Sequence, residues 1–393
     1  MSTNLIGTRI KALREQKGLS QEDLARAFGF KDRQTLSAIE TGERRVTAEE
    51  LLLAVEKLGV PLDYFTDPFR LDGEARFSWR QSGLAPERLS AYERSASRWI
   101  AAFRRMAPEA GYETPLLRHA LGLTRHHSFE DAAAAGQRFA AEFDLGEMPA
   151  KALPKVMEDR LGLLVLMVDA IEGISGAACR LPELDTVLIN RREVPGRRHF
   201  DLAHELFHIL TWDAMTPEHI EEPTETGGPR IEQLANSFAS AVLMPTTVLD
   251  RFGEWAALDR DDLVNKLNRV ADELSVTASA LKWRLVGLRR ITRARAQEIP
   301  DAALRNKRRT IAKVEAPPVA LFRMTPSNWM SEIAPVAAVE PPPLFSKPFA
   351  EVLARALDDG RISARRAADL LDLTVDDLPD LFRDHGIEAT VEL

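Results

Sequence analysis

The sequence predicts a mainly helical protein with a small β-sheet: an all-α head, an α+β middle domain and a small helical C-terminal unit. Three observations lead to this fold class. Short amphipathic segments separated by glycines fill residues 5–66, and two apolar runs of strand length lie within residues 161–190. Helical periodicity then returns over 199–285, before a proline-containing stretch at 314–348 separates the last unit.

Changes in composition set the expected domain boundaries. The head covers residues 1–67, and a helical connecting region covers 68–150. The middle domain covers 151–295, and a basic, proline-rich linker covers 296–348. The small helical unit covers 349–393, and we interpret it as an interaction module.

Composition places the chain among soluble globular proteins. Of its 393 residues, 45% are hydrophobic and 28% are charged, and the formal net charge of −8 argues against general affinity for nucleic acid. No apolar run approaches the about 18 residues of a membrane span, and the first residues lack a signal-peptide pattern. Because Cys179 is the single cysteine, no internal disulfide can form. We therefore expect a cytoplasmic protein without membrane association.

The head predicts a helix-turn-helix. A short helix over 20–28 begins at Ser20, and Asp23 follows three residues later, as in a capping box. Gly29 permits a tight turn, and a second helix follows over 32–40. In such a motif the second helix enters the major groove of double-stranded DNA, which is the expected partner.

The runs GLSQEDLA and LSAIETGER resemble the repressor-type (Xre/Cro-like) helix-turn-helix, and the resemblance extends over residues 5–66. It implies base contacts from Arg33, Gln34 and Ser37 and phosphate contacts from Arg44 and Arg45. Arginine and glutamine suit two-point contacts to guanine and adenine edges. Acids and bases are about balanced over residues 1–67, so nonspecific DNA binding should be weak. Protein docking by the head is the alternative.

The middle domain carries a His-Glu-x-x-His motif within a predicted helix. Residues four apart share a helix face, so His204 and His208 can present two imidazole nitrogens to one metal ion. Glu205 lies beside the first ligand, where its carboxylate can accept a proton from a water activated by the metal. The helical spacing of neighbouring apolar residues predicts packing against a core; these are Phe200, Ala203, Phe207 and Leu210.

A catalytic zinc usually takes three protein ligands, so a third is needed. The predicted helix over 230–245 offers Glu232, and Asn236, one turn later, can orient a ligand imidazole through its other nitrogen. The preceding Pro/Gly-rich loop offers acidic rivals: Glu218, Glu221, Glu222 and Glu225. A loop holds a ligand less rigidly than a helix, which favours Glu232.

Three separated blocks resemble the ImmA/IrrE metallopeptidases: RHFDLAHELFH at 198–208, EQLANSFA at 232–239 and LMP at 243–245. The resemblance implies a zincin-like fold and a metallo-endopeptidase. It also implies that His204, His208 and Glu232 hold Zn²⁺, with Mn²⁺ as the alternative, and that Glu205 is the general base. The implied substrate is a repressor or antitoxin whose cleavage releases a stress, phage-defence or mobile-element response.

A non-catalytic transcription regulator or antitoxin, using the zincin-like fold as a sensor or toxin-binding module, is the alternative. An intact Glu205 favours the enzyme, because a purely structural metal site has no need of it. The residue that stabilises the oxyanion stays open. All three tyrosines lie far upstream of the motif, which leaves His219, His199 and Arg197 as candidates.

Apolar runs at 161–168 and 186–190 predict buried strands, with a turn region containing Gly173 and Gly176 between them. These strands either only cover the motif helix or offer an edge to an extended peptide. Cys179, between them, is interpreted as a small buried residue, and a thiolate that caps the zinc is the alternative.

Two further features concern partners. The basic run 282–313 predicts either a phosphate-binding surface for single-stranded nucleic acid or a solvated arm. Residues 363–371 and 375–385 predict a helix pair in the last unit. A homodimer is a further candidate assembly.

Overall fold

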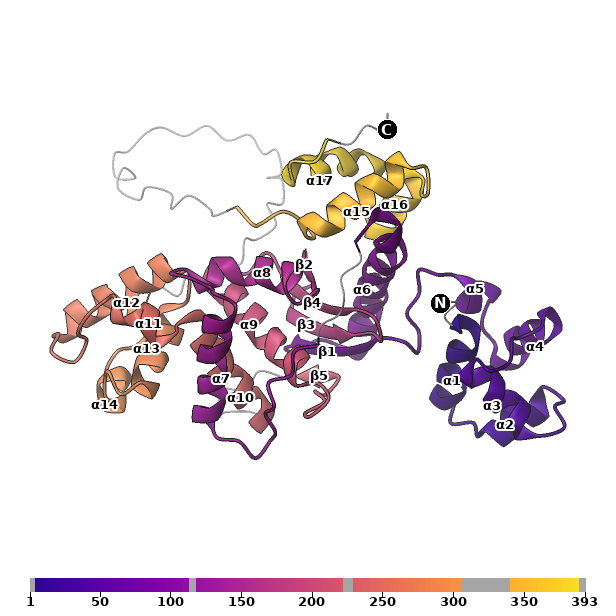
Figure 1. The fold of residues 1–393 in the computed structure, drawn as a ribbon, viewed down its shortest axis with the longest axis horizontal. Coiled ribbons are helices and arrows are strands. Elements are labelled where there is room, and N and C mark those ends of the chain that lie inside the picture. The colour runs from indigo at the N-terminus through magenta and orange to yellow at the C-terminus, as the bar shows by residue number, and fades with distance from the viewer. Residues whose placement is uncertain (1–3, 113–117, 222–228, 305–339, 389–393) are drawn as a thin grey trace, which may run out of the picture.

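The computed structural model describes residues 4–112, 118–221, 229–304 and 340–388 (Figure 1). A helical head is followed by a main body, in which helices cover both faces of one β-sheet. The expected fold class, mainly α with a small sheet, is confirmed. Within the described ranges, no helix is both long enough and apolar enough to cross a membrane.

The described part of the head consists of α1 (Leu5–Gln16), α2 (Gln21–Ala27), α3 (Arg33–Thr41), α4 (Ala48–Leu58) and α5 (Leu62–Thr66). The expected capping box begins α2: the Ser20 hydroxyl accepts from Asp23 N, and the Asp23 carboxylate accepts from Ser20 N. Gly29 has a φ of +73°, the left-handed conformation that the turn before α3 requires. The helix-turn-helix prediction is confirmed.

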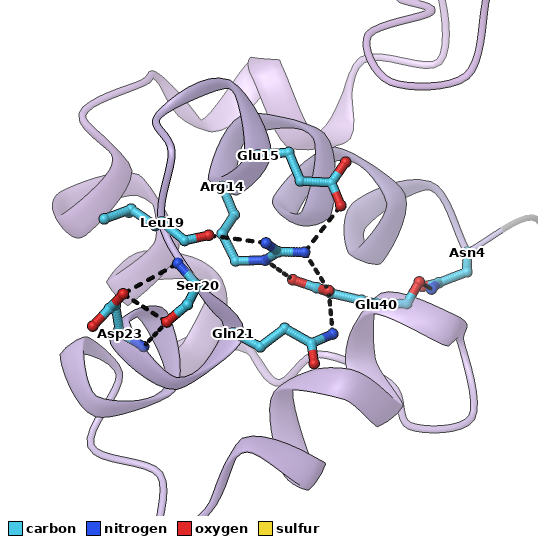
Figure 2. A network of polar contacts seen from close by, with 8 residues as sticks. All are labelled: Asn4, Arg14, Glu15, Leu19, Ser20, Gln21, Asp23 and Glu40. Atoms are coloured by element: carbon cyan, nitrogen blue, oxygen red, sulfur yellow. Dashed lines mark hydrogen bonds and ion pairs between the residues drawn. The ribbon is translucent and has the colours of Figure 1, made fainter.

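A buried ion pair joins α1 to α3 (Figure 2). Arg14 Nε donates to Glu40 Oε1 at 2.7 Å and Arg14 Nη2 donates to Glu40 Oε2 at 3.0 Å, and the two side chains are only 8% and 1% exposed. Gln21 on α2 also donates to Glu40, at 2.9 Å, and Asn4 donates to Ile39 O at 2.7 Å. This network fixes α3 against α1 and α2.

The segment after α5 is bound to α1. The fully buried Arg9 donates to Tyr64 O at 3.0 Å and to Arg70 O at 2.6 Å. Gly73 lies so close to α1 that a Cβ atom there would come within 2.3 Å of the Ala12 side chain. The contacts of the head therefore extend beyond residue 67, where its boundary was expected.

The β-sheet has the strand order β2-β4-β3-β1-β5. Its strands are β1 (Arg76–Gln81), β2 (Leu164–Val168), β3 (Ile174–Arg180), β4 (Asp185–Asn190) and β5 (Ile220–Glu221). β3 pairs antiparallel with β1 and with β4, whereas the pairs β2–β4 and β1–β5 are parallel. β2 and β4 confirm the two expected strands.

Two strands differ from the sequence-based expectation. β3 contains Gly176 and occupies much of the stretch expected to be a turn region. A Cβ atom at Gly176 would lie only 3.1 Å from Leu188 O, so this glycine marks a close approach inside a strand. β1 comes from the connecting region that was expected to be helical, and it forms by pairing Arg76 with Arg180, far along the chain.

One face of the sheet is covered by α7 (Phe129–Glu142), α8 (Pro149–Asp159), α9 (Pro195–Thr211) and α10 (Arg230–Leu243). α9 packs on β3 and β4 and also contacts α10. α7 approaches α10 closely, since a Cβ atom at Gly136 would lie 2.5 Å from Phe238 O. The chain continues into α11 (Thr246–Asp250), α12 (Arg260–Leu274), α13 (Ala278–Gly287), α14 (Arg293–Gln297) and a 3₁₀ turn, Asp301–Ala303.

The opposite face is covered by α6 (Pro86–Met106), with a 3₁₀ turn at Pro108–Ala110, and by the C-terminal helices. These are α15 (Lys347–Asp358), α16 (Ala364–Leu371), a 3₁₀ turn at Val375–Asp377 and α17 (Leu378–Asp384). Phe345 N donates to Met167 O on β2 at 2.6 Å, and Phe349 lies fully buried in the same core. The segment expected to be a separate interaction module therefore packs as part of the main body.

We expect Glu40→Ala to loosen the head selectively. The substitution removes the buried carboxylate that pairs with the Arg14 guanidinium, which costs about 3 kcal/mol, so hydrogen-exchange protection of α1 and α3 amides should fall about 100-fold. Glu22→Ala is the matched control, because Glu22 and Arg26 form an ion pair whose side chains are both 73% exposed. Equal protection in the two variants would contradict a structural role for the buried pair.

Candidate functional site

Helix α9 carries the His-Glu-x-x-His motif into the interior of the main body. Pro195 occupies its first turn, where a missing backbone N–H is tolerated. The helix is buried from Asp201 to Thr211, and His204, Glu205 and His208 have no exposed surface. Packing against the sheet on one side and α10 on the other thus holds three polar side chains inside the protein.

The two histidines meet Glu232 of α10. His204 Nε2 lies 3.1 Å from His208 Nε2 and 3.1 Å from Glu232 Oε2, and His208 Nε2 lies 3.4 Å from Glu232 Oε1. One ligand atom from each residue lies within 4.8 Å of the others. Zinc binds histidine nitrogen and carboxylate oxygen at about 2.1 Å, which places such ligands about 3.4 Å apart in a tetrahedral site. The donor set and its spacing therefore fit a divalent metal ion.

The surroundings prepare the imidazoles as ligands. Asn236 Oδ1 lies 3.0 Å from His204 Nδ1, so a proton on Nδ1 is donated to the amide oxygen and Nε2 is left to bind metal. Burial, together with the positive charge of Arg80, lowers the pKa of His204 well below its usual value. Burial, with His204 and Arg80 adding to its effect, lowers the pKa of His208 to about 3. Both rings are neutral, the form that binds metal.

Glu205 of α9 lies against β3. A Cβ atom at Gly176 would be 3.5 Å from Glu205 Cγ, so the glycine leaves room for this side chain. β3 is paired on both sides, by β4 and by β1. The strand beside Glu205 is therefore not an edge to which a peptide could add, and the edges of the sheet are β2 and β5.

A charged cluster beside the histidines was not identified from the sequence. Arg80, on β1, lies with Nε 3.5 Å from Asp201 Oδ1, and Arg197 Nε lies 3.6 Å from Asp201 Oδ2. Burial raises the pKa of Asp201, and the two guanidinium groups oppose that effect. Asp201 precedes His204 by one turn of α9, a spacing that could have suggested a common face. Arg80 has no such local signal, because it lies in a distant strand.

The three candidates for oxyanion stabilisation lie in different places. His219 is 2.7 Å from Glu93 Oε2, and Glu93 also accepts from Trp79, whose ring belongs to the core on the opposite face of the sheet. His199 Nδ1 contacts Ser275 O at 2.9 Å, at the end of α12. Arg197 alone lines a cavity of about 620 Å³ that Asn236 also lines. Of the three, Arg197 is the one beside the histidine cluster.

Among the described residues, the acidic rivals to Glu232 do not join the histidines. Glu218 is exposed, and Glu221 belongs to β5. Glu222 and Glu225 lie outside the described residues. Within the described part of the chain, the group able to hold a metal is His204, His208 and Glu232.

Cys179 does not face the metal cluster. It is fully buried on β3 in the core shared with α6, whereas its neighbour Ala178 faces the α9 side. Burial raises the pKa of the Cys179 thiol well above its usual value. The alternative of a thiolate that caps the metal is wrong, and the cysteine is a small buried residue.

The head presents most of the expected DNA contacts on and after α3. Arg33 and Gln34 are exposed in its first turn, Ser37 is half-buried one turn later, and Arg45 is exposed after the helix. Arg44 differs because its guanidinium donates to both oxygens of Glu50, at 2.9 and 2.7 Å. Arg44 therefore orders the loop between α3 and α4 in addition to any phosphate contact.

The basic run 282–313 is not a continuous exposed surface over its described part. Lys282 is buried and donates to Ile299 O and Asp301, and Arg284 is buried and donates to Met244 O. Two further members are bound by the fold: Arg290 pairs with Asp250, and Arg295 donates to Ala256 O and Leu258 O. Tertiary packing uses these charges, and residues 305–313 lie outside the described residues.

The fold and the site define a class of protein: a helix-turn-helix head joined to a metallopeptidase-type domain with two histidines and one glutamate at its centre. Comparison with known families agrees with this class. Residues 10–65 match a helix-turn-helix family, and residues 160–286 match the IrrE N-terminal-like domain of a peptidase family. The chain thus contains a helix-turn-helix domain and an IrrE/ImmA-like domain, as the sequence resemblances implied.

Two curated relatives show partial similarity. The HTH-type transcriptional regulator PrpR of Mycobacterium tuberculosis is 22% identical over 66% of this chain and 60% of its own length. The radiation response metalloprotease IrrE of Deinococcus deserti is 38% identical over 18% of this chain and 28% of its own length. The chain thus spans less than two thirds of each relative. No solved structure matches it.

We expect the purified chain to hold about one divalent ion. His204→Ala and Glu232→Ala should lose the ion, and Asn236→Ala should weaken its affinity about 10- to 100-fold, since it releases the His204 ring. Metal analysis and competition with a chelating dye measure both effects. His219→Ala is the control and should keep the ion, because His219 binds Glu93 elsewhere. Full occupancy in Glu232→Ala would move the third ligand to the 218–225 cluster.

Proposed function

We propose that the chain is a DNA-binding regulator whose middle domain is a metal-dependent endopeptidase. Its substrate is a partner regulatory protein of the repressor or antitoxin class, and its cleavage triggers a stress or mobile-element response. The observation that carries the proposal is the cluster of His204, His208 and Glu232. Glu205 lies beside it, on the helix α9 that carries the two histidines. Zn²⁺ suits this donor set best, and Mn²⁺ is the alternative.

The chain's own residues divide the chemistry between them. His204, His208 and Glu232 would hold the ion, and Asn236 fixes the His204 ring so that Nε2 faces it. A bound divalent ion supplies a Lewis acid that polarises a carbonyl and lowers the pKa of water. The Glu205 carboxylate accepts a proton from the attacking water and returns it to the amine nitrogen that leaves. Arg197 and Arg80 place positive charge beside the cluster, where negative charge develops on the substrate oxygen.

A second function is supported by one comparison. The similarity to PrpR, a protein named as a transcriptional regulator, extends over far more of this chain than the similarity to IrrE. This favours a transcription regulator, and the alternative function is therefore a non-catalytic regulator or antitoxin in which the middle domain senses a ligand or binds a toxin. The burial of Glu205 beside the histidines favours the enzyme, because an ionisable side chain is costly in the interior without a task.

The DNA-binding part of the proposal rests on α3. Arg33, Gln34 and Ser37 would contact base edges, and Arg44 and Arg45 would contact phosphates of double-stranded DNA. A regulator of this kind acts in the cytoplasm, and a homodimer would let two heads read two half-sites.

We expect Glu205→Gln to abolish cleavage while the fold and the metal content stay unchanged, because the substitution removes only proton transfer. Incubation with candidate repressors and antitoxins, followed by mass spectrometry of the products, measures the loss. Glu218→Gln, in the exposed acidic loop, serves as the control and should cleave normally. Cleavage that survives in Glu205→Gln would disprove the assigned mechanism.

The head makes a separate prediction. Arg33→Ala combined with Gln34→Ala should weaken binding to a cognate operator by about 10- to 100-fold and leave binding to unrelated duplexes nearly unchanged. Arg45→Ala should instead weaken binding to all duplexes alike and reduce the salt slope by about one. Fluorescence anisotropy over a series of salt concentrations separates the two effects. A uniform loss in the double variant would show that α3 does not read bases.

A further inference from the structure

A cavity of about 620 Å³ opens beside the histidine cluster, between β1, α9, α10 and α13. Asn236 connects the two places, because it lines the cavity and also contacts His204 Nδ1 at 3.0 Å. Asp201, one turn before His204 on α9, lines it as well. A group that enters the cavity therefore lies next to the candidate metal ligands.

The lining is positively charged. It contains three arginines against one aspartate, and the aspartate, Asp201, already interacts with Arg80 and Arg197. Arg197 Nε also lies 3.7 Å from Glu193 Oε1, so the charges of this wall are largely paired within the protein. Arg284, on another wall, adds a third guanidinium to which no carboxylate is joined among the described residues.

Arg284 is unusual in being buried without a counter-charge. It is only 6% exposed, and its Nε donates to Met244 O at 3.1 Å, while its buried Nη2 has no hydrogen-bond partner in the described structure. Burial, with the nearby charge of Arg290, lowers the pKa of Arg284 to about 10, so it stays charged at neutral pH. A buried guanidinium with an unused donor lowers the stability of the folded protein, and an anion bound in the cavity would offset that loss.

The start of α13 adds to this preference for an anion. Thr277 caps the helix by accepting from Ala280 N, and Thr277 and Ser279 both line the cavity. The N-terminal end of a helix carries partial positive charge, so its amides favour a carboxylate or phosphate. The helix has ten residues, enough to build such an end.

Aromatic surface flanks the charged wall. Trp283 is 44% exposed and Phe200 is partly buried, and both line the cavity. An apolar flank beside cationic groups suits an anion carried on a short aliphatic stem. A glutamate or aspartate side chain has this form.

We propose that the cavity is a specificity pocket that binds an acidic side chain of the peptide substrate, close to the bond that is cut. The proposal rests on the proposed peptidase function and names its substrate preference. Arg284 and Arg197 bind the carboxylate, and Trp283 packs on the aliphatic stem. Peptides with an acidic residue at one fixed position from the scissile bond are the preferred substrates.

The first test measures binding without turnover. The probes are acetyl-Ala-Ala-Glu-Ala-Ala-amide and its glutamine counterpart, and the protein is the full chain with Glu205→Gln, loaded with Zn²⁺. Calorimetry should show about tenfold or tighter binding of the glutamate peptide. Arg284→Met, which keeps the volume but removes the charge, should erase the difference. Arg290→Gln is the matched control, since Arg290 pairs with Asp250 and does not line the cavity.

A further variant guards against misfolding at the buried site. Arg197, whose side chain is 50% exposed, is a far less buried position than Arg284, and Arg197→Gln should weaken binding of the glutamate peptide several-fold. Equal binding of the two peptides to the unsubstituted cavity would overturn the proposal. So would Arg284-dependent binding of inorganic phosphate when neither peptide binds, because the cavity would then serve a phosphate group.

The second test maps cleavage in a library of peptides derived from a proteome. The intact chain should cut where an acidic residue holds one fixed position, and Arg284→Met should cut with that preference lost. Cleavage without an acidic preference would disprove the specificity pocket and still support the peptidase function. Selective binding of the glutamate peptide without any cleavage would instead support an acidic-side-chain pocket and disprove the peptidase function.

Discussion

The burial of α9 is the constraint on which the rest of the main body depends. From Asp201 to Thr211 this helix is buried between the sheet and α10, so each polar group there needs a partner within the protein or in a ligand. His204 meets Asn236 and Glu232, and His208 meets Glu232. The close α7–α10 contact at Gly136 holds α10, and therefore Glu232, at the required distance. The packing of α7 on α10 therefore also sets the geometry of the candidate metal site.

Features with a local signal could be predicted from the sequence. The spacing of His204 and His208, the capping box of Ser20 and Asp23, and the helix that carries Glu232 all lie within a few residues of their own chain. Helix periodicity and capping chemistry are short-range effects, so the residues themselves indicate them. The two family resemblances follow from the same local segments.

Features that depend on distant contacts could not be predicted. Arg80 reaches Asp201 only because β1 pairs with β3, and no pattern near residue 80 indicates that pairing. Gly176 was interpreted as a turn because a strand rarely favours glycine, but the close approach of Glu205 and Leu188 requires it. Lys282 and Arg284 look like part of an exposed basic run until tertiary packing places them inside. The sequence of the C-terminal helices likewise indicates an apolar face, but it does not indicate that this face packs on α6 and the sheet.

The position of β1 has a mechanical consequence. This strand begins shortly after the head, and Arg9 ties the intervening segment to α1 through Arg70 O. Near its end the same strand places Arg80 at the wall of the cavity beside the histidines. The head, with its helix-turn-helix, and the cavity wall beside the histidines are thus joined by one short segment that is hydrogen-bonded to α1.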